Sequence, residues 1–356
     1  MYRNNTIGVV VPAYNEEGFL ADVVRDIPEF VDAVFLVDDA STDGTWGEAG
    51  KVMREQFDGR PSIPTTSPLV EREQTSLDAR VADAETIGHI TRLRHRENRG
   101  AGGAIKTGYL AALERDIDVV VTIDGDGQMD SDRVPSLLEP IVVGQAEYAK
   151  GNRFANSDVF HEMPPFRLFG NILLTVLTRI SSGYWSLSDP QNGFTAISRD
   201  ALRVADIESI WEYYGYMNQL VARLNAENVR IADVPMPATY GDEESSIDYG
   251  QYIRRVSVLL LVSFFQRLWK MHGHPNYHPT LFGYAGGTLV GAVSLLRVVF
   301  SAATKRSRVS TTEVAWGVIL GTVVIAIAAL LDKDTEPEVI DYESKRVPRG
   351  RSKHEA

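Results

Sequence analysis

Residues 118–128 read Asp-Val-Val-Val-Thr-Ile-Asp-Gly-Asp-Gly-Gln, and the rest of the chain is organised around this stretch. Its β-branched first half predicts a buried central strand. Asp124 and Asp126 follow at positions i and i+2, which point to the same side of an extended chain. Gly125 and Gly127 let the backbone turn sharply and let a ligand approach closely. We therefore expect the two carboxylates to converge on one bound group.

That group is expected to be a metal ion. Two carboxylates and the amide oxygen of Gln128 suit a hard divalent cation, Mg²⁺ or Mn²⁺, that keeps positions open for phosphate oxygens. An EF-hand loop would also begin with this Asp spacing, but it needs Gly and Glu where this chain has Met129 and Pro135. An ordinary Asp-Gly turn is the alternative from this stretch alone. Ligands of open α/β sheets bind at the carboxyl ends of strands, where this run would lie.

Composition excludes several classes of site. The chain has 356 residues, enough for one large domain or two ordinary ones, and it contains no cysteine. Disulfides, thiolate nucleophiles and cysteine-ligated metals are therefore excluded. A formal net charge of -12 argues against a nucleic-acid-binding surface.

The N-terminal two thirds of the chain alternate between strand and helix patterns. Residues 6–11 and 33–37 read as buried strands, and each is followed by a polar loop and a helix. This rhythm predicts an α/β fold, with a mainly parallel sheet and helices on both faces. Residues 58–88 interrupt it with three prolines and many Ser and Thr, which predicts a surface insertion.

A glycine-rich turn at residues 100–103 opens another expected helix. Backbone N–H groups at such a helix start can cradle phosphate. Close packing of the helix against its neighbours explains the glycines equally well. The Gly-Lys-Ser/Thr ending of a P-loop is absent, so that motif is excluded.

The C-terminal third predicts membrane association. Residues 246–280 mix arginines with an apolar run, as in a helix at a bilayer interface. Residues 281–331 contain two apolar stretches, 281–300 and 314–331, each near the length of a membrane-spanning helix. Residues 332–356 are charged, and we expect a disordered tail. An apolar helix at 166–180 has two candidate roles, a core element or a membrane-facing surface.

Four motifs together resemble one family. They are Val-Val-Pro-Ala-Tyr-Asn-Glu-Glu at 10–17, Val-Asp-Asp-Ala-Ser-Thr-Asp-Gly-Thr at 37–45, Asn-Arg-Gly-Ala-Gly-Gly-Ala at 98–104 and Asp-Gly-Asp-Gly-Gln at 124–128. In this order they resemble the family 2 inverting glycosyltransferases of the GT-A fold, and most closely the polyprenyl-phosphate (dolichyl-phosphate) sugar synthases. The resemblance covers about residues 6–240, which implies a GT-A catalytic domain over residues 1–245.

The resemblance implies roles for individual residues. Those expected to bind a nucleotide-sugar donor are Pro12, Tyr14, Glu16, Asp38, Asp39, Asp124, Gly125 and Arg153. The expected metal ligands are Asp124, Asp126 and Gln128. The residues expected at the reaction itself are Asp126, Arg153 at a donor phosphate, and Asp189 facing the acceptor.

One departure from the family pattern concerns the acceptor. The family usually places an Arg and a Lys in the loop after the Val-Pro strand, but residues 240–246 read Tyr-Gly-Asp-Glu-Glu-Ser-Ser. Arg254 and Arg255 are the nearest substitutes, so we expect them to bind the acceptor phosphate. The alternative is that they only contact anionic lipid headgroups.

The implied activity is transfer of a hexose, from a donor of the UDP-glucose or GDP-mannose type, to a polyprenyl (dolichyl) phosphate with inversion. The product would feed protein glycosylation or surface glycan assembly. The expected location is the cell membrane, with several spans and a cytoplasmic catalytic domain. Two alternatives stay open. Residues 251–255, Gln-Tyr-Ile-Arg-Arg, approach the Gln-x-x-Arg-Trp of polysaccharide-extending synthases, and a non-enzymatic, membrane-tethered nucleotide-sugar-binding protein would share the fold.

Overall fold

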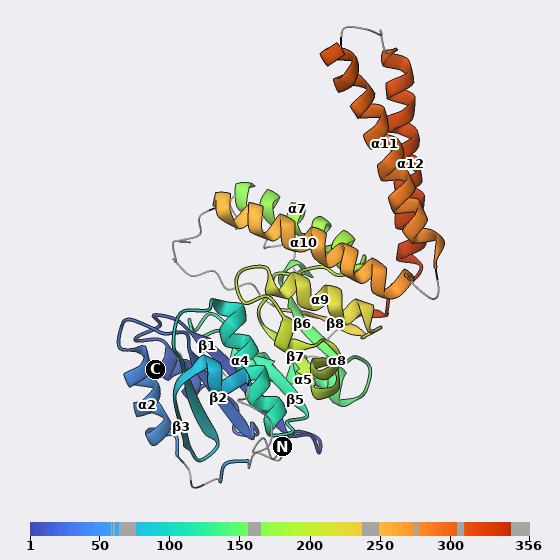
Figure 1. The fold of residues 1–356 in the computed structure, drawn as a ribbon. Helices are drawn as coiled ribbons and strands as arrows, with labels where there is room; N and C mark the ends of the chain where they lie inside the picture. Colours follow the sequence, from blue (N-terminus) through green and yellow to red (C-terminus); the bar gives the residue numbers. More distant parts are fainter. Residues whose placement is uncertain are drawn as a thin grey trace.

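The computed structural model describes residues 1–57, 59, 61–63, 76–155, 165–236, 249–273, 277–304 and 310–342. Within these ranges nine strands form one sheet (Figure 1). In sheet order the strands are β3 (Val81–Ile87), β4 (Ile90–His95), β2 (Ala33–Asp38), β1 (Ile7–Ala13), β5 (Val119–Thr122), β7 (Thr195–Ser198), β6 (Tyr148–Asn152), β8 (Ile231–Pro235) and β9 (Val339–Asp341).

Strands β4, β2, β1 and β5 run parallel, so their carboxyl ends meet at one edge of the sheet. Strand β7 is antiparallel to both β5 and β6, which makes the sheet mixed. The central strands are buried on both faces, which explains their nearly unbroken apolar sequences. The register places Ala13 opposite Asp38 and Val10 opposite Thr122. The acidic motifs after β2 and β5 therefore flank the end of β1.

Helices cover both faces of the sheet, as the α/β pattern predicts. One face packs on α1 (Leu20–Arg25), α2 (Thr45–Glu55) and α5 (Val134–Val142). The other packs on α4 (Ala101–Glu114), α8 (Arg199–Val204) and α9 (Tyr216–Ala226). The described part also contains the short helices α3 (Ser76–Arg80), η2 (Ser131–Arg133), η3 (Arg153–Ala155) and η4 (Ile207–Ser209).

Two predicted boundaries need correction. The expected insertion at 58–88 ends in α3 and in β3, which pairs antiparallel with β4 as a regular part of the sheet. The expected disordered tail at 332–356 begins with the last turn of a helix and then forms β9, which pairs parallel with β8. Both strands lie at edges of the sheet, where short or polar sequences suffice. The remaining residues of both segments, 64–75 and 343–356, lie outside the described ranges.

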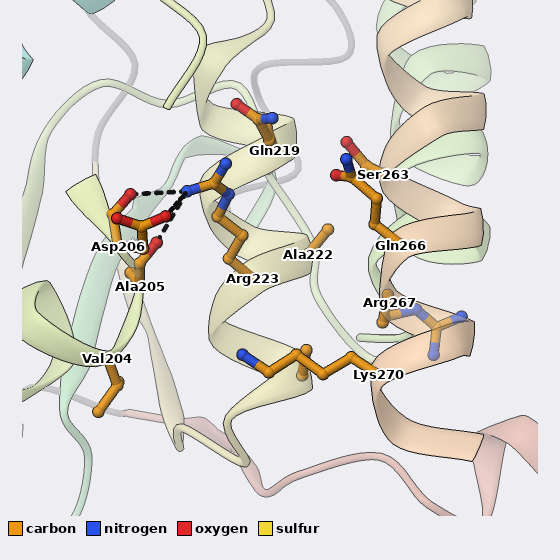
Figure 2. A pocket seen from close by; sticks show the side chains of 11 residues that line it. Val204, Ala205, Asp206, Gln219, Ala222, Arg223, Ser263, Gln266, Arg267 and Lys270 are labelled. Carbon is orange, nitrogen blue, oxygen red and sulfur yellow. Dashed lines mark hydrogen bonds and ion pairs between the residues drawn. The ribbon is translucent and has the colours of Figure 1, made fainter. Parts of the chain in front are cut away.

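Two long helices lie side by side against the α/β domain that holds the sheet (Figure 1). They are α7 (Pro165–Ser182) and α10 (Tyr249–His272), and α10 also packs on α9. A cavity of about 210 Å³ lies between α9 and α10. Arg223 lines it and donates to the carbonyl oxygens of Ala205 and Asp206 (Figure 2). This cavity contains none of the site residues expected from the sequence.

Helices α11 (Pro279–Thr304) and α12 (Thr311–Lys333) form a hairpin that projects away from the sheet (Figure 1). Residues 279–298 and 312–333 are long and apolar enough to span a membrane, with mean hydropathies of 1.4 and 2.6. The helices touch through glycine: a Cβ on Gly287 would lie 2.7 Å from the carbonyl oxygen of Gly321. Small residues at such crossings are typical of membrane helix pairs. The two predicted apolar helices are confirmed.

A buried ion pair joins the hairpin to helices α10 and α7. Arg267 of α10 donates to both carboxylate oxygens of Asp332 near the end of α12, at 2.9 and 2.8 Å. The same guanidinium donates to the carbonyl oxygens of Ile180 and Ser181 near the end of α7. Both charged groups are almost fully buried, so loss of either partner would leave the other charge without compensation. Asp332, expected in the tail, is thus a structural residue.

Candidate active site

Asp124 and Asp126 lie just beyond β5, at the carboxyl edge of the sheet. Gly125 connects them and donates its N–H to the carbonyl oxygen of Pro12, 3.1 Å away. A Cβ on Gly125 would lie 3.0 Å from that oxygen, so a side chain there would push the two backbone segments apart. The Oδ1 atom of Asp126 accepts the N–H of Gln128 at 3.0 Å and holds the turn. The structure therefore brings the Pro12 motif and the acidic motif together, as the sequence predicts.

The two carboxylates lack a protein cation. In the described ranges neither Asp124 nor Asp126 takes part in an ion pair. Burial and then the negative charge of Asp126 raise the pKa of Asp124 from 3.8 to about 7, against the opposing effect of Arg153. A cation between the two carboxylates would relieve this repulsion. The oxygen donors present therefore fit a divalent metal.

The protein alone would not complete such a metal site. No group of three or more His, Cys, Asp and Glu side chains suited to a metal occurs among the described residues. Asp124, Asp126 and Gln128 do line one cavity of about 180 Å³. A metal bound there would keep positions for ligands that arrive with a substrate, as Mg²⁺ in phosphate sites does.

Arg153 lines the same cavity and is bonded to the buried Asp189. The Nε and Nη2 atoms of Arg153 donate to the two carboxylate oxygens of Asp189 at 2.8 and 3.0 Å, and the Arg153 N–H adds a third bond. Asp189 is buried, whereas Arg153 reaches the cavity surface. Burial alone would raise the pKa of Asp189, but the bonds from Arg153 and the charge of Lys150 hold it below its ordinary value. Asp189 is therefore a fixed anion that orients Arg153.

Lys150 is a site residue that the sequence did not single out. Its side chain is completely buried and its Nζ donates to the carbonyl oxygen of Asp189. The same Nζ lies 3.8 Å from Oδ1 of Asp233 on β8. Burial lowers the pKa of Lys150, against the opposing charges of Asp233 and Asp189. A lysine in the middle of a short apolar strand was the available signal, because buried lysines need partners.

Asp38 and Asp39 differ in their environments. Oδ1 of Asp38 accepts the N–H of Ser41, and its buried Oδ2 lies 3.1 Å from Nε of Arg94 in an ion pair but accepts no hydrogen bond among the described residues. Asp39 is equally buried, and its Oδ1 accepts from His95 and from the N–H of Arg99. Oδ2 of Asp38 is buried against Arg94, whereas Oδ2 of Asp39 has neither a hydrogen bond nor an arginine partner in the described part of the chain, so Asp39 is the better suited of the two to accept from a donor.

The loop after β1 is tied to the loop after β2. The N–H of Asn15 donates to Ser41, and the N–H of Glu16 donates to Thr45 at 2.8 Å. Tyr14 directly precedes these anchored residues, with 46% of its surface exposed. Pro12, Tyr14 and Glu16 thus border the same strand ends as Asp39 and Asp124, and an exposed aromatic ring there is available to a ligand.

Residues 8–63 and 75–205 match the sequence family Glycosyl transferase family 2. The chain belongs to this family. A relative from Methanococcus voltae, UDP-N-acetylglucosamine–dolichyl-phosphate N-acetylglucosaminyltransferase, is 28% identical over 235 residues, which is 66% of this chain and 86% of the relative. The undecaprenyl-phosphate mannosyltransferase of Micrococcus luteus is 28% identical over 231 residues, which is 64% of this chain and 81% of that protein.

Among solved structures, the glycosyltransferase is similar to the mannosyltransferase PcManGT from Pyrobaculum calidifontis, determined in complex with GDP-Man and Mn²⁺. The identity is 14% and the TM-score 0.47, over 92% of this chain and 87% of that one. The family assignment confirms the prediction of a family 2 glycosyltransferase enzyme. The mixed, mainly parallel sheet with two-sided helix cover confirms the predicted GT-A architecture.

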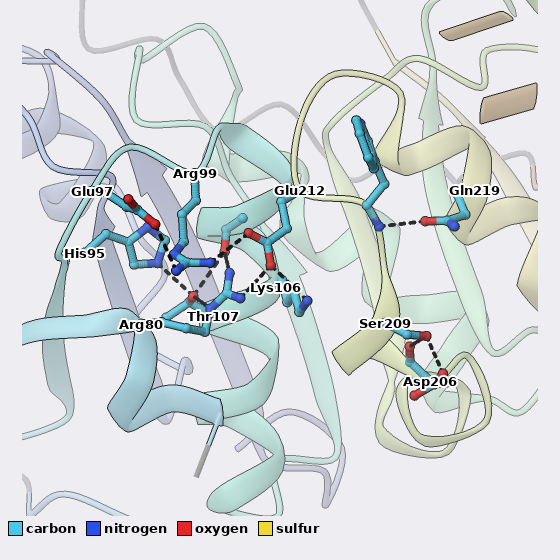
Figure 3. Close-up of polar contacts among 12 residues, drawn as sticks. Arg80, His95, Glu97, Arg99, Lys106, Thr107, Asp206, Ser209, Glu212 and Gln219 are labelled. Atoms are coloured by element: carbon cyan, nitrogen blue, oxygen red, sulfur yellow. Dashed lines mark hydrogen bonds and ion pairs between the residues drawn. The ribbon is translucent and has the colours of Figure 1, made fainter. Parts of the chain in front are cut away.

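The glycine-rich turn of this glycosyltransferase serves close packing. The N–H of Gly103 donates to the carbonyl oxygen of Glu212 at 2.7 Å, and a Cβ on Gly102 would lie 2.8 Å from the same oxygen. The Glu212 carboxylate in turn accepts from Arg80, Arg99 and Lys106 (Figure 3). Partial burial would raise the pKa of Glu212, but the bonds from Arg80 and Lys106 lower it to about 2. Of the two interpretations of these glycines, the structure supports packing.

The predicted acceptor residues lie apart from the acidic cavity. Arg254 and Arg255 are exposed near the start of α10 and do not line the cavity. The acidic loop 240–246, where the family motif is missing, lies outside the described residues. The structure of the described part therefore leaves the acceptor role of the two arginines as a prediction.

Proposed function

We propose that the protein transfers a hexose from a nucleotide-diphosphate sugar to a polyprenyl phosphate, with inversion at the anomeric carbon. The proposal rests on the cavity that Asp124, Asp126 and Arg153 line together at the carboxyl edge of the sheet, in a chain of glycosyl transferase family 2. A metal-bound diphosphate requires two kinds of group: carboxylates free to bind the metal, and a guanidinium nearby for a phosphate. Asp124 and Asp126, which have no ion-pair partner among the described residues, and Arg153 supply them. The curated relatives named for dolichyl and undecaprenyl phosphates support the acceptor class.

The residues divide the work on the donor. Asp39, with Pro12, Tyr14 and Glu16 around it, binds the nucleoside. Asp124, Asp126 and Gln128 hold Mg²⁺ or Mn²⁺, which supplies charge neutralisation for the leaving nucleoside diphosphate. Arg153, which lines the same cavity, binds a donor phosphate. Asp189 differs from its expected acceptor-facing role: it is buried and bonded to Arg153, so we assign it to positioning that guanidinium.

The acceptor needs little activation. A lipid monophosphate is ionised near neutral pH and attacks the anomeric carbon directly through a phosphate oxygen. The C–O bond to the nucleoside diphosphate breaks as the new bond forms on the opposite face. No strong general base is required, unlike attack by a sugar hydroxyl. The catalytic demand is therefore electrostatic, and the metal ligands and Arg153 meet it.

The proposed membrane position follows from exposed apolar surface. Helix α7 exposes Ile172, Leu173, Val176 and Leu177, and the neighbouring helix α10 exposes Val258, Leu261, Val262, Phe265 and Trp269. We infer that this surface lies in the bilayer interface, which favours the membrane-facing role considered for α7. Strand β9 pairs with β8 after α12, so both ends of the hairpin return to the catalytic domain. Two spans and a cytoplasmic catalytic domain fit this arrangement.

Cysteine labelling tests the topology in this cysteine-free chain. The connection between the spans carries Lys305, Arg306 and Arg308, which the positive-inside rule would place in the cytoplasm. We expect Ser307→Cys to react with an impermeant reagent from outside the cell, and Ser352→Cys to react only after permeabilisation. Labelling of both from the same side would contradict the hairpin.

Incubation of membranes with labelled nucleotide sugars, followed by lipid extraction, tests the reaction. We expect a single sugar on a phosphate-linked lipid with one donor of the UDP- or GDP-linked series. A long polymer would instead identify an extending synthase. Donor binding with neither transfer nor hydrolysis would identify a non-enzymatic nucleotide-sugar-binding protein.

Arg254 and Arg255 provide a test of the acceptor. If they bind the lipid phosphate, Arg254→Ala with Arg255→Ala raises KM for that lipid, or lowers the rate, while donor binding is unchanged. The assay is done in detergent, where membrane recruitment no longer contributes. Arg203→Ala, which removes an exposed arginine of α8, is the control. Wild-type acceptor kinetics in the double variant would reduce the arginines to membrane anchoring.

A further inference from the structure

A buried histidine stands directly behind Asp39. The Nδ1 atom of His95 lies 2.6 Å from Oδ1 of Asp39, and its Nε2 lies 2.8 Å from Oγ1 of Thr107. All three residues are nearly or completely buried. His95 ends β4 and Asp39 follows β2, so the parallel pairing of these strands brings the two side chains together.

The chemistry of the pair sets the direction of the bond. A carboxylate only accepts hydrogen bonds, so Nδ1 of His95 carries the proton and donates it to Asp39. The N–H of Arg99 donates to the same oxygen at 2.8 Å. Within the described residues, both bonds to the Asp39 carboxylate end on Oδ1. The Oδ2 atom therefore remains available to accept from a ligand.

The far side of the imidazole is also held. Thr107 accepts from Nε of Arg80 at 2.9 Å, and Nη1 of Arg80 donates to Glu212 at 2.6 Å (Figure 3). Arg80 is itself buried, so the imidazole has polar contacts at both nitrogens and little room to rotate. An imidazole that is hydrogen-bonded at both nitrogens keeps one orientation, as a metal-ligating histidine does when its second nitrogen is hydrogen-bonded. It therefore also holds its partner in place.

We propose that His95 is a positioning residue for the donor: it fixes the Asp39 carboxylate so that Oδ2 faces an N–H or O–H group of the nucleoside. This inference rests on the proposed function, because it takes Asp39 as the nucleoside ligand. Asp38 is held by other groups: Ser41 donates to its Oδ1, and its buried Oδ2 forms an ion pair with Arg94. His95 itself contacts no substrate and acts through Asp39.

Two amide substitutions separate positioning from packing. In His95→Asn the amide nitrogen is attached to Cγ, as Nδ1 is in histidine. It can therefore still donate to Asp39. In His95→Gln the side-chain amide reaches the position of Nε2, so a bond to Thr107 is kept and that to Asp39 is lost. Each variant removes one of the two bonds, which makes them matched controls for each other.

The measurement is the dissociation constant of UDP and of GDP by calorimetry, with the thermal midpoint recorded for each variant. We expect His95→Gln to weaken the preferred diphosphate by on the order of tenfold to a hundredfold, as befits loss of a charge-assisted hydrogen bond. His95→Asn should stay within about threefold of wild type. With saturating donor, kcat of His95→Gln should change less than its donor KM.

Equal diphosphate affinities in the two variants would overturn the positioning role, whether both match wild type or both fall together with the thermal midpoint. If His95→Gln does not fold, Thr107→Val replaces it, and an unchanged donor KM in that variant also overturns the role. A wild-type protein that binds neither diphosphate would instead remove the proposed function, and this inference with it. The two failures are therefore distinguishable.

Discussion

The two acidic pairs at the edge of the sheet are similar in sequence and opposite in physical state. Asp38 and Asp39 are buried beside groups that the protein supplies: Arg94 for one, His95 and a backbone N–H for the other. Asp124 and Asp126 have no ion-pair partner in the described ranges, and the pKa of Asp124 is raised to about 7. The first pair has charged or polar partners within the protein, whereas the second has no ion-pair partner among the described residues.

This difference suits the first pair to recognition of the donor and the second pair to the transfer reaction. A carboxylate held by its own protein keeps one geometry and is suited to read a neutral nucleoside. A carboxylate pair left in mutual repulsion is suited to a cation that arrives with the substrate, because binding relieves the repulsion. Substitution of an aspartate in one pair should therefore affect rate, affinity and stability differently from substitution in the other pair.

The largest expected effect is on the rate, from the second pair. Asp126→Asn should lower transfer at least about a hundredfold, because the leaving diphosphate is then poorly neutralised. Excess chelator should abolish transfer by the wild type, and Mg²⁺ or Mn²⁺ should restore it. Initial rates of lipid-linked sugar formation measure both effects. Full activity of the wild type in excess chelator would exclude a metal role for this pair.

An intermediate effect is expected on donor affinity, from the first pair. Asp39→Asn should weaken nucleoside diphosphate binding on the order of tenfold, because the charged acceptor for the nucleoside is lost. Asp38→Asn should leave that affinity close to wild type and lower the thermal midpoint, since it breaks the contact with Arg94. Titration calorimetry and thermal unfolding measure the two outcomes. The reverse assignment would show that Asp38 reads the donor.

The smallest effect concerns stability without metal. The folded-state pKa of Asp124 is about 7 and its ordinary value is 3.8, so the folded protein holds this proton more tightly than the unfolded chain. This group therefore costs stability as pH rises from about 4 through 7. Asp124→Asn removes that cost, so its thermal midpoint in chelator should exceed the wild-type value at pH 8. The gap should shrink as pH falls toward 4.

Metal should reverse this last comparison. Added Mg²⁺ or Mn²⁺ binds the folded wild type at the two carboxylates and raises its thermal midpoint by mass action. Asp124→Asn lacks a ligand and should respond weakly. An equal response of both proteins to metal would place the ion elsewhere.

Local sequence determined much of this protein. The β-branched runs and the carboxylates after them identify the central strands and their polar ends, because periodicity and turn chemistry are short-range properties. The two apolar stretches identify the hairpin helices for the same reason. The charged C-terminus was misread, because the pairing of β9 with β8 depends on a strand about a hundred residues earlier in the chain.

Tertiary structure decided what each charged group does. Sequence places Asp38 and Asp39 side by side but does not say which partner each one meets; the pairing of β2 with β4 brings Arg94 to one and His95 to the other. Lys150 contacts Asp189 only because the pairing of β6 with β7 brings the turn before β7 next to β6. The state of a carboxylate depends on burial and on charges within a few ångströms, and in a folded chain those neighbours come from distant parts of the sequence.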